Sequence, residues 1–546
     1  MRKFFNTVLV CTLALGLLVT GCSSNTTAPP AKTDQAGTPQ ETPKGNKFVR
    51  YNSGEEPKSL DPSIGYDEPS WVVVYNMFEG LTRLDKDENP IAGVAKEWKV
   101  SPDGKVYTFT LRDDAKWSNG EAITADDFVY AWKHMLDPKT ASESAFLAYG
   151  IKGAEDFNSG KGSPDALGVK AVDAKTLEVT LTQPAPWFLG LLTVPTFYPI
   201  NKAAAEKDPK WFAEAATIIS NGPFKITDWK HDAEIKLEKN EHYWDASSVK
   251  IDGVIFKMVK DSNTAYQLYQ SGELEISEIP SDLSDQLFAE GKVNVGDSAG
   301  LEFYRLNTSK PPFSNVNIRK AFNMAIDRQK LVDLVQRRKQ KPAVGLISYG
   351  FNDPAGGQFR DVGGAFVTYD PAEAKKLLET GMAELGLTQL PEITIEFNTS
   401  DTHQKNAEAV QEMLKSALGV EVKLANMERQ VLSDKQKKLD YHISRSSWIP
   451  DFADPINTLE IMLSESSSNR TGWKNAKFDQ LIKDAYVELD NAKRYQMMHE
   501  AEKIFMEDAP IIPLYFYNST NLQKDNLTGV LRPVFGYVNF KHAELK

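Results

Sequence analysis

The chain has 546 residues, of which 41% are hydrophobic and 25% are charged, and its formal net charge is −12. These values are ordinary for a soluble globular protein, and the length allows several domains. The acidic balance and the lack of a basic stripe in the sequence argue against a nucleic-acid partner.

The first 22 residues predict an export signal. Residues 1–5 (MRKFF) are basic, and residues 7–19 form an apolar run that is too short for a comfortable membrane span. Residues 19–22 (VTGC) resemble a bacterial lipobox, which implies cleavage after residue 21 and diacylglyceryl addition to Cys22. The alternative is an ordinary secretory signal with a chance cysteine.

Cysteine usage supports the lipobox, because Cys11 lies inside the signal and Cys22 is the only other cysteine. The mature chain then has no disulfide, no thiolate metal site and no cysteine nucleophile. We expect no cofactor and no metal. Residues 22–46 are rich in Ser, Thr, Pro and Gln, so they predict a disordered tether to a folded body that begins near Phe48.

Strand-like and helix-like segments alternate through the body. The periodicity predicts strands over 105–112, 176–181, 392–400 and 420–428, and helices over 124–136, 315–335, 369–382 and 401–418. The helix at 124–136 opens on a Thr cap and carries acids in its first turn. The strand, helix and strand of 392–428 form the unit of a parallel sheet, so we predict a mixed α/β body with more than one lobe.

A run of ordered motifs makes a more specific prediction. Residues 95–132 (AKEWKVSPDGKVYTFTLRDDAKWSNGEAITADDFVYAW) resemble the signature of the extracellular solute-binding proteins of dipeptide and oligopeptide ABC importers, the family 5 solute-binding proteins. Further stretches follow in that family's order, among them SLDP (59–62), NMFEGLTRL (76–84), SNGPFKITDW (220–229), NEHYWD (240–245), NTSDTH (398–403) and WIPDFADP (448–455). The resemblance covers nearly all of residues 47–546 and looks closest to Gram-positive lipoproteins, some of which take cell-wall peptides.

The resemblance implies a two-lobed periplasmic-binding-protein-like fold (type II) with an additional third domain. Lobe I would comprise residues 47–80, 201–275 and 536–546, the additional domain residues 81–200, and lobe II residues 276–535. It also implies a function: a protein that is not an enzyme captures short peptides outside the cell and delivers them to an ABC permease and its ATPase subunits. We expect a monomer that its N-terminal lipid holds at the extracellular face of the cell membrane.

Residues 444–456 (SRSSWIPDFADPI) suit such a task on physical grounds. An extended peptide has a cation at one end and a carboxylate at the other, and its backbone groups do not depend on its sequence. Adding the peptide as an extra strand gives its backbone groups hydrogen-bond partners. An acid at one end and a base at the other bind the two charged ends of the peptide, so their separation selects its length. Arg445 and Asp451 are six residues apart, a span of at most ~20 Å, which suits about three to five ligand residues.

The family's pattern assigns roles to individual positions. Asp451 matches the residue that pairs with the peptide ammonium, and Arg445 matches one that meets the carboxylate of short ligands. The other matches are Ser447 and Ile449 (main-chain pairing), Trp448 (side-chain pocket), His403 (carboxylate of a longer peptide), Glu68 to Ser70 (the opposite ligand edge), Tyr537 (near the ammonium), and Asn221 and Gly222 (a turn lining the cleft).

Each assignment has a structural alternative. Asp451 would be a turn or cap residue, Arg445 a surface ion-pair partner, His403 a helix-start residue, Trp448 plain core, Glu68 a solvated acid, and the Asn221–Gly222 turn purely structural. The sequence also departs from the pattern. Pro450 removes one backbone donor, Arg429 stands where some relatives have an aromatic, and the basic run 336–341 favours either acidic ligands or simple solvation.

Other functions remain open from the sequence. The seven histidines show no HExxH spacing, and neither a G-x-S-x-G elbow nor a phosphate-binding G-x-x-x-x-G-K-[ST] loop occurs, so a hydrolase is disfavoured. A cell-wall (murein) peptide, a non-peptide solute such as a nickel chelate, an opine or a sugar, and a signalling or folding role at the cell surface are the remaining alternatives.

Overall fold

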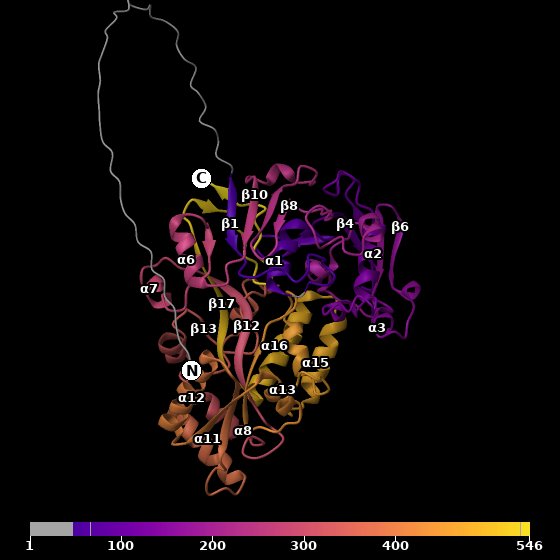
Figure 1. The fold of residues 1–546 in the computed structure, drawn as a ribbon. Helices are drawn as coiled ribbons and strands as arrows, with labels where there is room; N and C mark the ends of the chain where they lie inside the picture. The colour runs from indigo at the N-terminus through magenta and orange to yellow at the C-terminus, as the bar shows by residue number, and fades with distance from the viewer. Residues whose placement is uncertain (1–46, 66, 536) are drawn as a thin grey trace, which may run out of the picture. The chain divides into compact units, whose positions relative to one another are not determined.

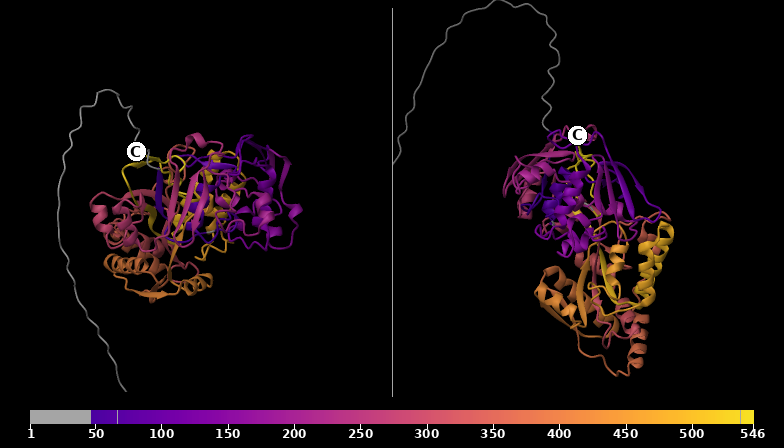
Figure 2. Two further views of the ribbon diagram at one scale, coloured as in Figure 1. Left: turned by 45° about the horizontal axis from the view of Figure 1, so that its top comes forward. Right: turned by 90° about the vertical axis from the view of Figure 1, so that its right-hand side faces the viewer.

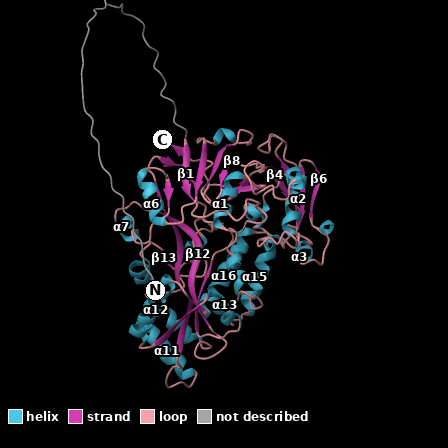
Figure 3. Ribbon diagram, viewed as in Figure 1, coloured by secondary structure: helices cyan, strands magenta, loops and turns pink. Residues whose placement is uncertain are grey.

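One mixed sheet of eleven strands is the framework of the computed structural model within the residues that it describes, 47–65, 67–535 and 537–546 (Figures 1 and 3). Its strands follow the order β15-β14-β16-β12-β17-β11-β1-β10-β9-β8, and β13 also pairs with β17. In chain order these strands are β1 (Phe48–Asn52), β8 (Phe224–Lys230), β9 (Glu234–Lys239), β10 (Gly253–Lys257), β11 (Ile276–Ser277), β12 (Asn294–Leu306), β13 (Lys341–Pro342), β14 (Ile393–Asn398), β15 (Val422–Met427), β16 (Ile443–Trp448) and β17 (Ile511–Gln523).

Two long strands join the halves of this sheet. β12 and β17 each have 13 residues and pair in antiparallel orientation along most of their length. Their register shifts between Asp297 and Leu301, where the ladder is interrupted. At its far end β17 pairs with β11, which in turn pairs with β1. β17 therefore lies between β12 and β11 and links the strands β15, β14, β16 and β12 to the strands β11, β1, β10, β9 and β8.

The predicted strand-helix-strand unit is confirmed. β14 and β15 are parallel, and α12 (Asp401–Leu418) connects them over the predicted residues. Gly419, with a φ of +72°, ends α12 in the left-handed conformation that glycine adopts without strain. The predicted helix at 369–382 is also present as α11 (Pro371–Glu384), which Asp370 caps.

The single helix predicted over 315–335 is wrong. The chain forms α8 (Val316–Met324), breaks, and continues as α9 (Arg328–Lys330) and a π-helical turn, η5 (Leu331–Gln336). Asp327 accepts a hydrogen bond from the Lys330 N–H at 3.0 Å and so starts a new helix. The break lets Arg328 turn inward, where its Nε donates to the Pro513 carbonyl oxygen at 2.7 Å.

A separate four-stranded sheet forms within residues 81–200. Its order is β4 (Ala95–Val100), β5 (Val106–Leu111), β7 (Thr176–Thr180) and β6 (Val169–Asp173), and a hairpin of β2 (Thr82–Leu84) and β3 (Pro90–Ala92) precedes it. The predicted strands at 105–112 and 176–181 are confirmed as β5 and β7. So is the predicted helix, α2 (Ala125–Leu136), which opens on a capping box of Thr124 and Asp127.

Shorter elements complete the described chain. They are α1 (Glu68–Met77), η1 (Ala145–Ala148), α3 (Ala154–Asn158), η2 (Pro164–Ala166), α4 (Phe188–Leu191), η3 (Pro195–Phe197), α5 (Lys202–Lys207), η4 (Ala246–Ser248), α6 (Ser262–Ser271), α7 (Ser284–Ala289), α10 (Phe359–Gly363), α13 (Arg429–Lys437), α14 (Ile456–Leu459), η6 (Glu460–Met462), α15 (Ala476–Val487), α16 (Asn491–Asp508), β18 (Leu527–Thr528) and β19 (Glu544–Leu545).

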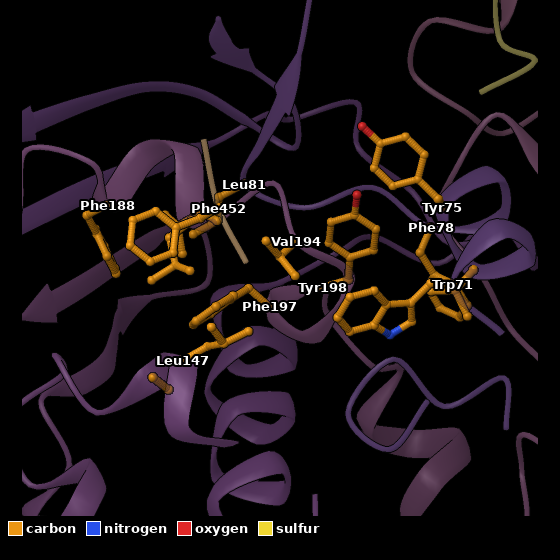
Figure 4. Packing of buried hydrophobic residues seen from close by; sticks show 14 of the residues in the cluster. Trp71, Tyr75, Phe78, Leu81, Leu147, Phe188, Val194, Phe197, Tyr198 and Phe452 are labelled. Atoms are coloured by element: carbon orange, nitrogen blue, oxygen red, sulfur yellow. The ribbon is translucent and has the colours of Figure 1, made fainter. Parts of the chain in front are cut away.

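Helices α15 and α16 lie next to residues 81–200, as Figure 1 and the right-hand view of Figure 2 show. The turn between these helices approaches Gly104, where a Cβ would lie only 2.7 Å from Leu489 Cδ2. Phe452 is buried in the same apolar cluster as Phe188 and Phe197 of this region (Figure 4). Apolar packing thus continues from residues 81–200 into the segment that follows β16.

The predicted signal, Cys22 and the predicted tether lie outside the described residues. Among the helices of the described part, none is both long enough and apolar enough to cross a membrane.

Candidate functional site

A cavity of about 430 Å³ gathers segments that are far apart in the sequence. Four of the predicted site residues line it: Glu68, Ile449, Asp451 and Tyr537. The other lining residues are Asp67, Trp71, Tyr75, Leu84, Leu147, Thr193, Val194, Pro195, Ser298, Pro450, Val534 and Phe535. The charged residues of this lining are all carboxylates, so its electrostatic character favours a cationic group.

Helix α1 supplies one wall of the cavity. Asp67 caps it, because its carboxylate accepts hydrogen bonds from the Ser70 N–H at 3.1 Å and from the Ser70 hydroxyl at 2.8 Å. Ser70 is fully buried, and its hydroxyl also accepts a bond from the Ser59 N–H at 3.2 Å. The cap therefore places Glu68 at the first helical position facing the cavity, while the predicted Ser70 is engaged inside the fold.

Aromatic rings form the adjoining surface. The Tyr537 ring lies edge-on to Trp71, with centroids 5.3 Å apart, and to Tyr75, with centroids 6.3 Å apart. Tyr75 and Tyr198 stack further inside the cluster that Figure 4 shows. These ring contacts hold the Tyr537 side chain at the cavity before any ligand binds.

Asp451 follows β16 and is held by a polar chain. Its N–H donates to Asn457 Oδ1 at 2.9 Å, and Asn457 Nδ2 donates to Glu460 Oε1 at 3.1 Å. The Tyr486 hydroxyl donates to the other oxygen of Glu460. Burial raises the pKa of Glu460 to about 8, and the charges of Asp451 and Asp454 add to the effect. Glu460 is therefore mostly protonated at neutral pH.

Arg445 is engaged in an ion pair rather than open to solvent. Its guanidinium donates to Glu302 through Nε at 2.7 Å and through Nη2 at 2.5 Å, and the Tyr517 hydroxyl donates to the same carboxylate at 2.6 Å. Glu302 is buried, with 1% of its side chain exposed. Burial works against the charged guanidinium, but the hydrogen bonds and charge of Glu302 outweigh it and raise the pKa of Arg445.

His403 lies in the first turn of α12 close to this pair. Its Nδ1 lies 3.1 Å from the Asn398 carbonyl oxygen, which can only accept, so the proton of the neutral ring sits on Nδ1. Burial and the positive charge of Arg445 lower the pKa of His403. At neutral pH its Nε2 is therefore an acceptor, and a ligand carboxylate needs the ring to be protonated first.

The backbone of β16 offers an open edge beside these groups. β14 pairs with β16 only at Ile443 and Ser444, whereas β12 pairs with it through Trp448. Gln436 Nε2 donates to the Arg445 carbonyl oxygen at 2.9 Å on the side of β14. Backbone N–H and C=O groups of every second residue in a strand point to the same edge. The groups of Ser447, two residues after Arg445, therefore point to the same edge as those of Arg445. No strand of the described residues covers this edge at Ser447.

A second cavity of about 470 Å³ adjoins Asp451. The half-buried Trp448 lines it together with Asp451, Asn457 and Glu460. The Trp448 Nε1 is buried and has no hydrogen-bond partner within the described residues. Its volume is in the range of small-molecule pockets, and Phe146, Trp448, Ile461 and Leu463 form its apolar part beside polar and charged residues.

The structure places Asn221 and Gly222 away from both cavities. Asn221 Oδ1 accepts from the Glu79 N–H at 3.0 Å, and its Nδ2 donates to the Glu79 carbonyl oxygen at 2.9 Å. A Cβ on Gly222 would lie 2.6 Å from the Met77 carbonyl carbon. Both residues hold the end of α1 against the 220–223 turn.

Sequence reasoning missed several contributors. Glu302 had a usable signal, since it is an acid in the mostly apolar start of 301–306 (LEFYRL). Leu147 and residues 193–195 line the main cavity from the region 81–200 and carried no such signal. In the described part of the chain no cluster of three or more His, Cys, Asp or Glu residues could hold a metal ion.

Comparisons with known proteins give one consistent family. The family model of the bacterial extracellular solute-binding proteins, family 5 (Middle), matches residues 89–470. The dipeptide-binding protein DppE of Bacillus subtilis (strain 168) is 48% identical over 97% of this chain and 98% of its own.

Two solved structures show the same fold. The unliganded open form of the periplasmic murein tripeptide-binding protein MppA superposes with a TM-score of 0.83 at 33% identity, covering 92% of this chain and 98% of that one. Listeria monocytogenes OppA bound to peptide gives 0.69 at 34% identity, covering 92% and 99%. The superposition is thus better on the unliganded open form at nearly equal identity. This chain belongs to the bacterial extracellular solute-binding proteins of family 5 and has their α/β periplasmic-binding-protein-like fold.

Proposed function

We propose that this protein is the substrate-binding component of a peptide ABC importer, which captures short oligopeptides outside the cell and delivers them to a membrane permease. The observation that carries the proposal is the acid-lined cavity containing Asp451, which directly follows β16, a strand whose edge on the side of β14 is unpaired beyond Ser444 within the described residues. A relative that is nearly half identical is a dipeptide-binding protein, and a structural neighbour is bound to peptide.

In this proposal the peptide adds to β16 as a further strand. Its backbone pairs with the open edge at Ser447, and alternation along the chain puts Ile449 on that edge as well. Pro450 then faces the other edge, so its missing N–H does not interrupt the pairing. Asp451 receives the ammonium, Tyr537 and Glu68 enclose that end, and Trp448 lines a pocket for a side chain.

The carboxylate end of the ligand meets Arg445 and His403. Because Glu302 already neutralises Arg445, the pair attracts a carboxylate less strongly than a free guanidinium would. His403 adds attraction only when it is protonated. Recognition at the ammonium end therefore carries more of the specificity than recognition at the carboxylate end.

The lobes of the protein enclose the peptide. Residues 47–80, 201–275 and 536–546 act as lobe I, residues 276–535 as lobe II, and residues 81–200 as the additional domain, with β12 and β17 in the hinge between the lobes. The peptide binds one lobe and the other closes over it, excluding water and strengthening the terminal ion pairs. The protein works as a monomer, carries a lipid on Cys22 at the outer face of the membrane, and leaves its ligand uncleaved.

Calorimetry of Asp451 variants tests the function. Asp451→Asn keeps the shape and the backbone N–H but removes the charge, so it should weaken binding of trialanine by about 10- to 100-fold. Binding of N-acetyl-trialanine, which lacks the ammonium, should change little. Equal losses for the two peptides would refute the ammonium role, and recovery of cleaved trialanine would refute the non-catalytic one.

A further inference from the structure

Trp187 is one of the residues of 81–200 that lie against the segment that carries Asp451. The indole stacks on Phe452, with centroids 6.2 Å apart and an interplanar angle of 13°. It also meets the Tyr486 ring edge-on at 5.0 Å, and the Arg494 guanidinium lies 5.0 Å from its centroid. All three partners belong to the part of the chain predicted as lobe II.

Each of the three partners of Trp187 belongs to the segment after β16 or forms a direct contact with it. Phe452 is the neighbour of Asp451 and is only 8% exposed. Arg494 forms a bidentate ion pair with Asp454, at 2.7 and 2.6 Å, and both side chains are almost fully buried. Three separate contacts of one indole therefore converge on residues 451–460.

The third contact continues to the backbone of Asp451. The Tyr486 hydroxyl donates to Glu460, Asn457 donates to the same carboxyl group, and Asn457 Oδ1 accepts the Asp451 N–H. The raised pKa of Glu460 keeps this group mostly neutral, so it does not add a second full charge beside Asp451. The aromatic face of Trp187 thus holds both ends of the turn.

We propose that Trp187 is a positioning residue for peptide binding, which holds the Asp451 turn in place from outside the lobe that carries it. This inference rests on the proposed role of Asp451 as the ammonium receptor. It gives residues 81–200 a defined part in recognition: they set the position of the charged group without offering a charge of their own there.

Hydrogen exchange tests the positioning itself. Trp187→Ala should speed amide exchange within residues 450–460, whereas Trp187→Phe, which keeps an aromatic face for Phe452, should restore most of the protection. Trp98→Ala is the matched control, because Trp98 is a half-buried tryptophan of the same region that packs on Phe109 instead. Equal exchange at 450–460 in wild type and Trp187→Ala, or the same increase in Trp98→Ala, would overturn the proposal.

Binding supplies the second readout. Trp187→Ala should weaken trialanine by about tenfold and N-acetyl-trialanine much less, since an aromatic contact is worth up to about this factor. Equal losses for both peptides would overturn the proposal. If Asp451→Asn itself fails to discriminate the two peptides, the ammonium role falls and the inference that depends on it falls too, yet the exchange result still reports separately whether Trp187 holds the turn.

Discussion

Arg445 meets Glu302 side-on, with Nε 2.7 Å from Oε1 and Nη2 2.5 Å from Oε2. The two residues stand on neighbouring strands, β16 and β12, and Glu302 is almost fully buried. A buried carboxylate of this kind destabilises the fold unless a partner of opposite charge compensates it. The pair therefore ties the stability of the fold to the group that is proposed to meet the ligand carboxylate.

Removing one member of this ion pair should lower the free energy of unfolding more than removing both members. Arg445→Ala leaves Glu302 buried and uncompensated, so it should lower the free energy of unfolding by about 3 kcal/mol. Arg445→Ala combined with Glu302→Gln should recover much of that loss. Urea denaturation measures both values, and a double variant no more stable than Arg445→Ala would contradict the ion-pair explanation.

Glu460 should make stability depend on pH. Its pKa is about 8 in the folded chain against an ordinary value of 4.5, so the unfolded state ionises first as the pH rises. The stabilisation that protonated Glu460 gives to the folded state is therefore complete below pH 4.5 and is lost between about pH 4.5 and 8. Above pH 8 it changes no further. Glu460→Gln cannot ionise. The melting temperature of this variant minus that of the wild type should therefore increase as the pH rises from about 4.5 to about 8. A constant difference from pH 4 to 9 would show that Glu460 ionises normally.

Local signals predicted much of the fold. The apolar alternation of 105–112 and the capping sequence of 124–136 are short-range patterns, and the structure has both elements where they were expected. The parallel unit of β14, α12 and β15 also follows from one contiguous segment. The prediction extends one helix over 315–335 because Asp327 fits a helix surface. The sequence pattern does not show that the neighbouring Arg328 donates to the Pro513 carbonyl oxygen, far away in the sequence.

The site was predictable only in part. The resemblance placed Glu68, Ile449, Asp451 and Tyr537 in one region, and the structure brings them to one cavity. It could not reveal that Glu302 pairs with Arg445, because that contact depends on the register of β12 against β16. The same is true of Trp187 and Phe452, which are 265 positions apart in the chain and meet through tertiary packing alone.

Gly222 should be required for folding rather than for binding. A methyl group there would press on the Met77 backbone at 2.6 Å, so Gly222→Ala should destabilise the protein by about 1–3 kcal/mol. Gly190→Ala is the control, because nothing lies within 4 Å of its Cβ position. Urea unfolding compares the two. A Gly222→Ala variant that keeps wild-type stability but loses peptide affinity would return this residue to the binding site.

His403 should couple binding to proton uptake. Its Nδ1–H is used by the Asn398 carbonyl oxygen, so only protonation of Nε2 lets the ring donate to a ligand carboxylate. Because burial lowers its pKa below 6.5, that proton is missing at pH 7.5 and must be taken up on binding. A peptide long enough to reach it, such as tetraalanine, should bind more tightly at pH 5.5 than at pH 7.5, and His403→Ala should abolish the difference. Calorimetry in buffers of different ionisation enthalpy counts the protons directly, and tetraalanine binding without proton uptake would exclude the contact.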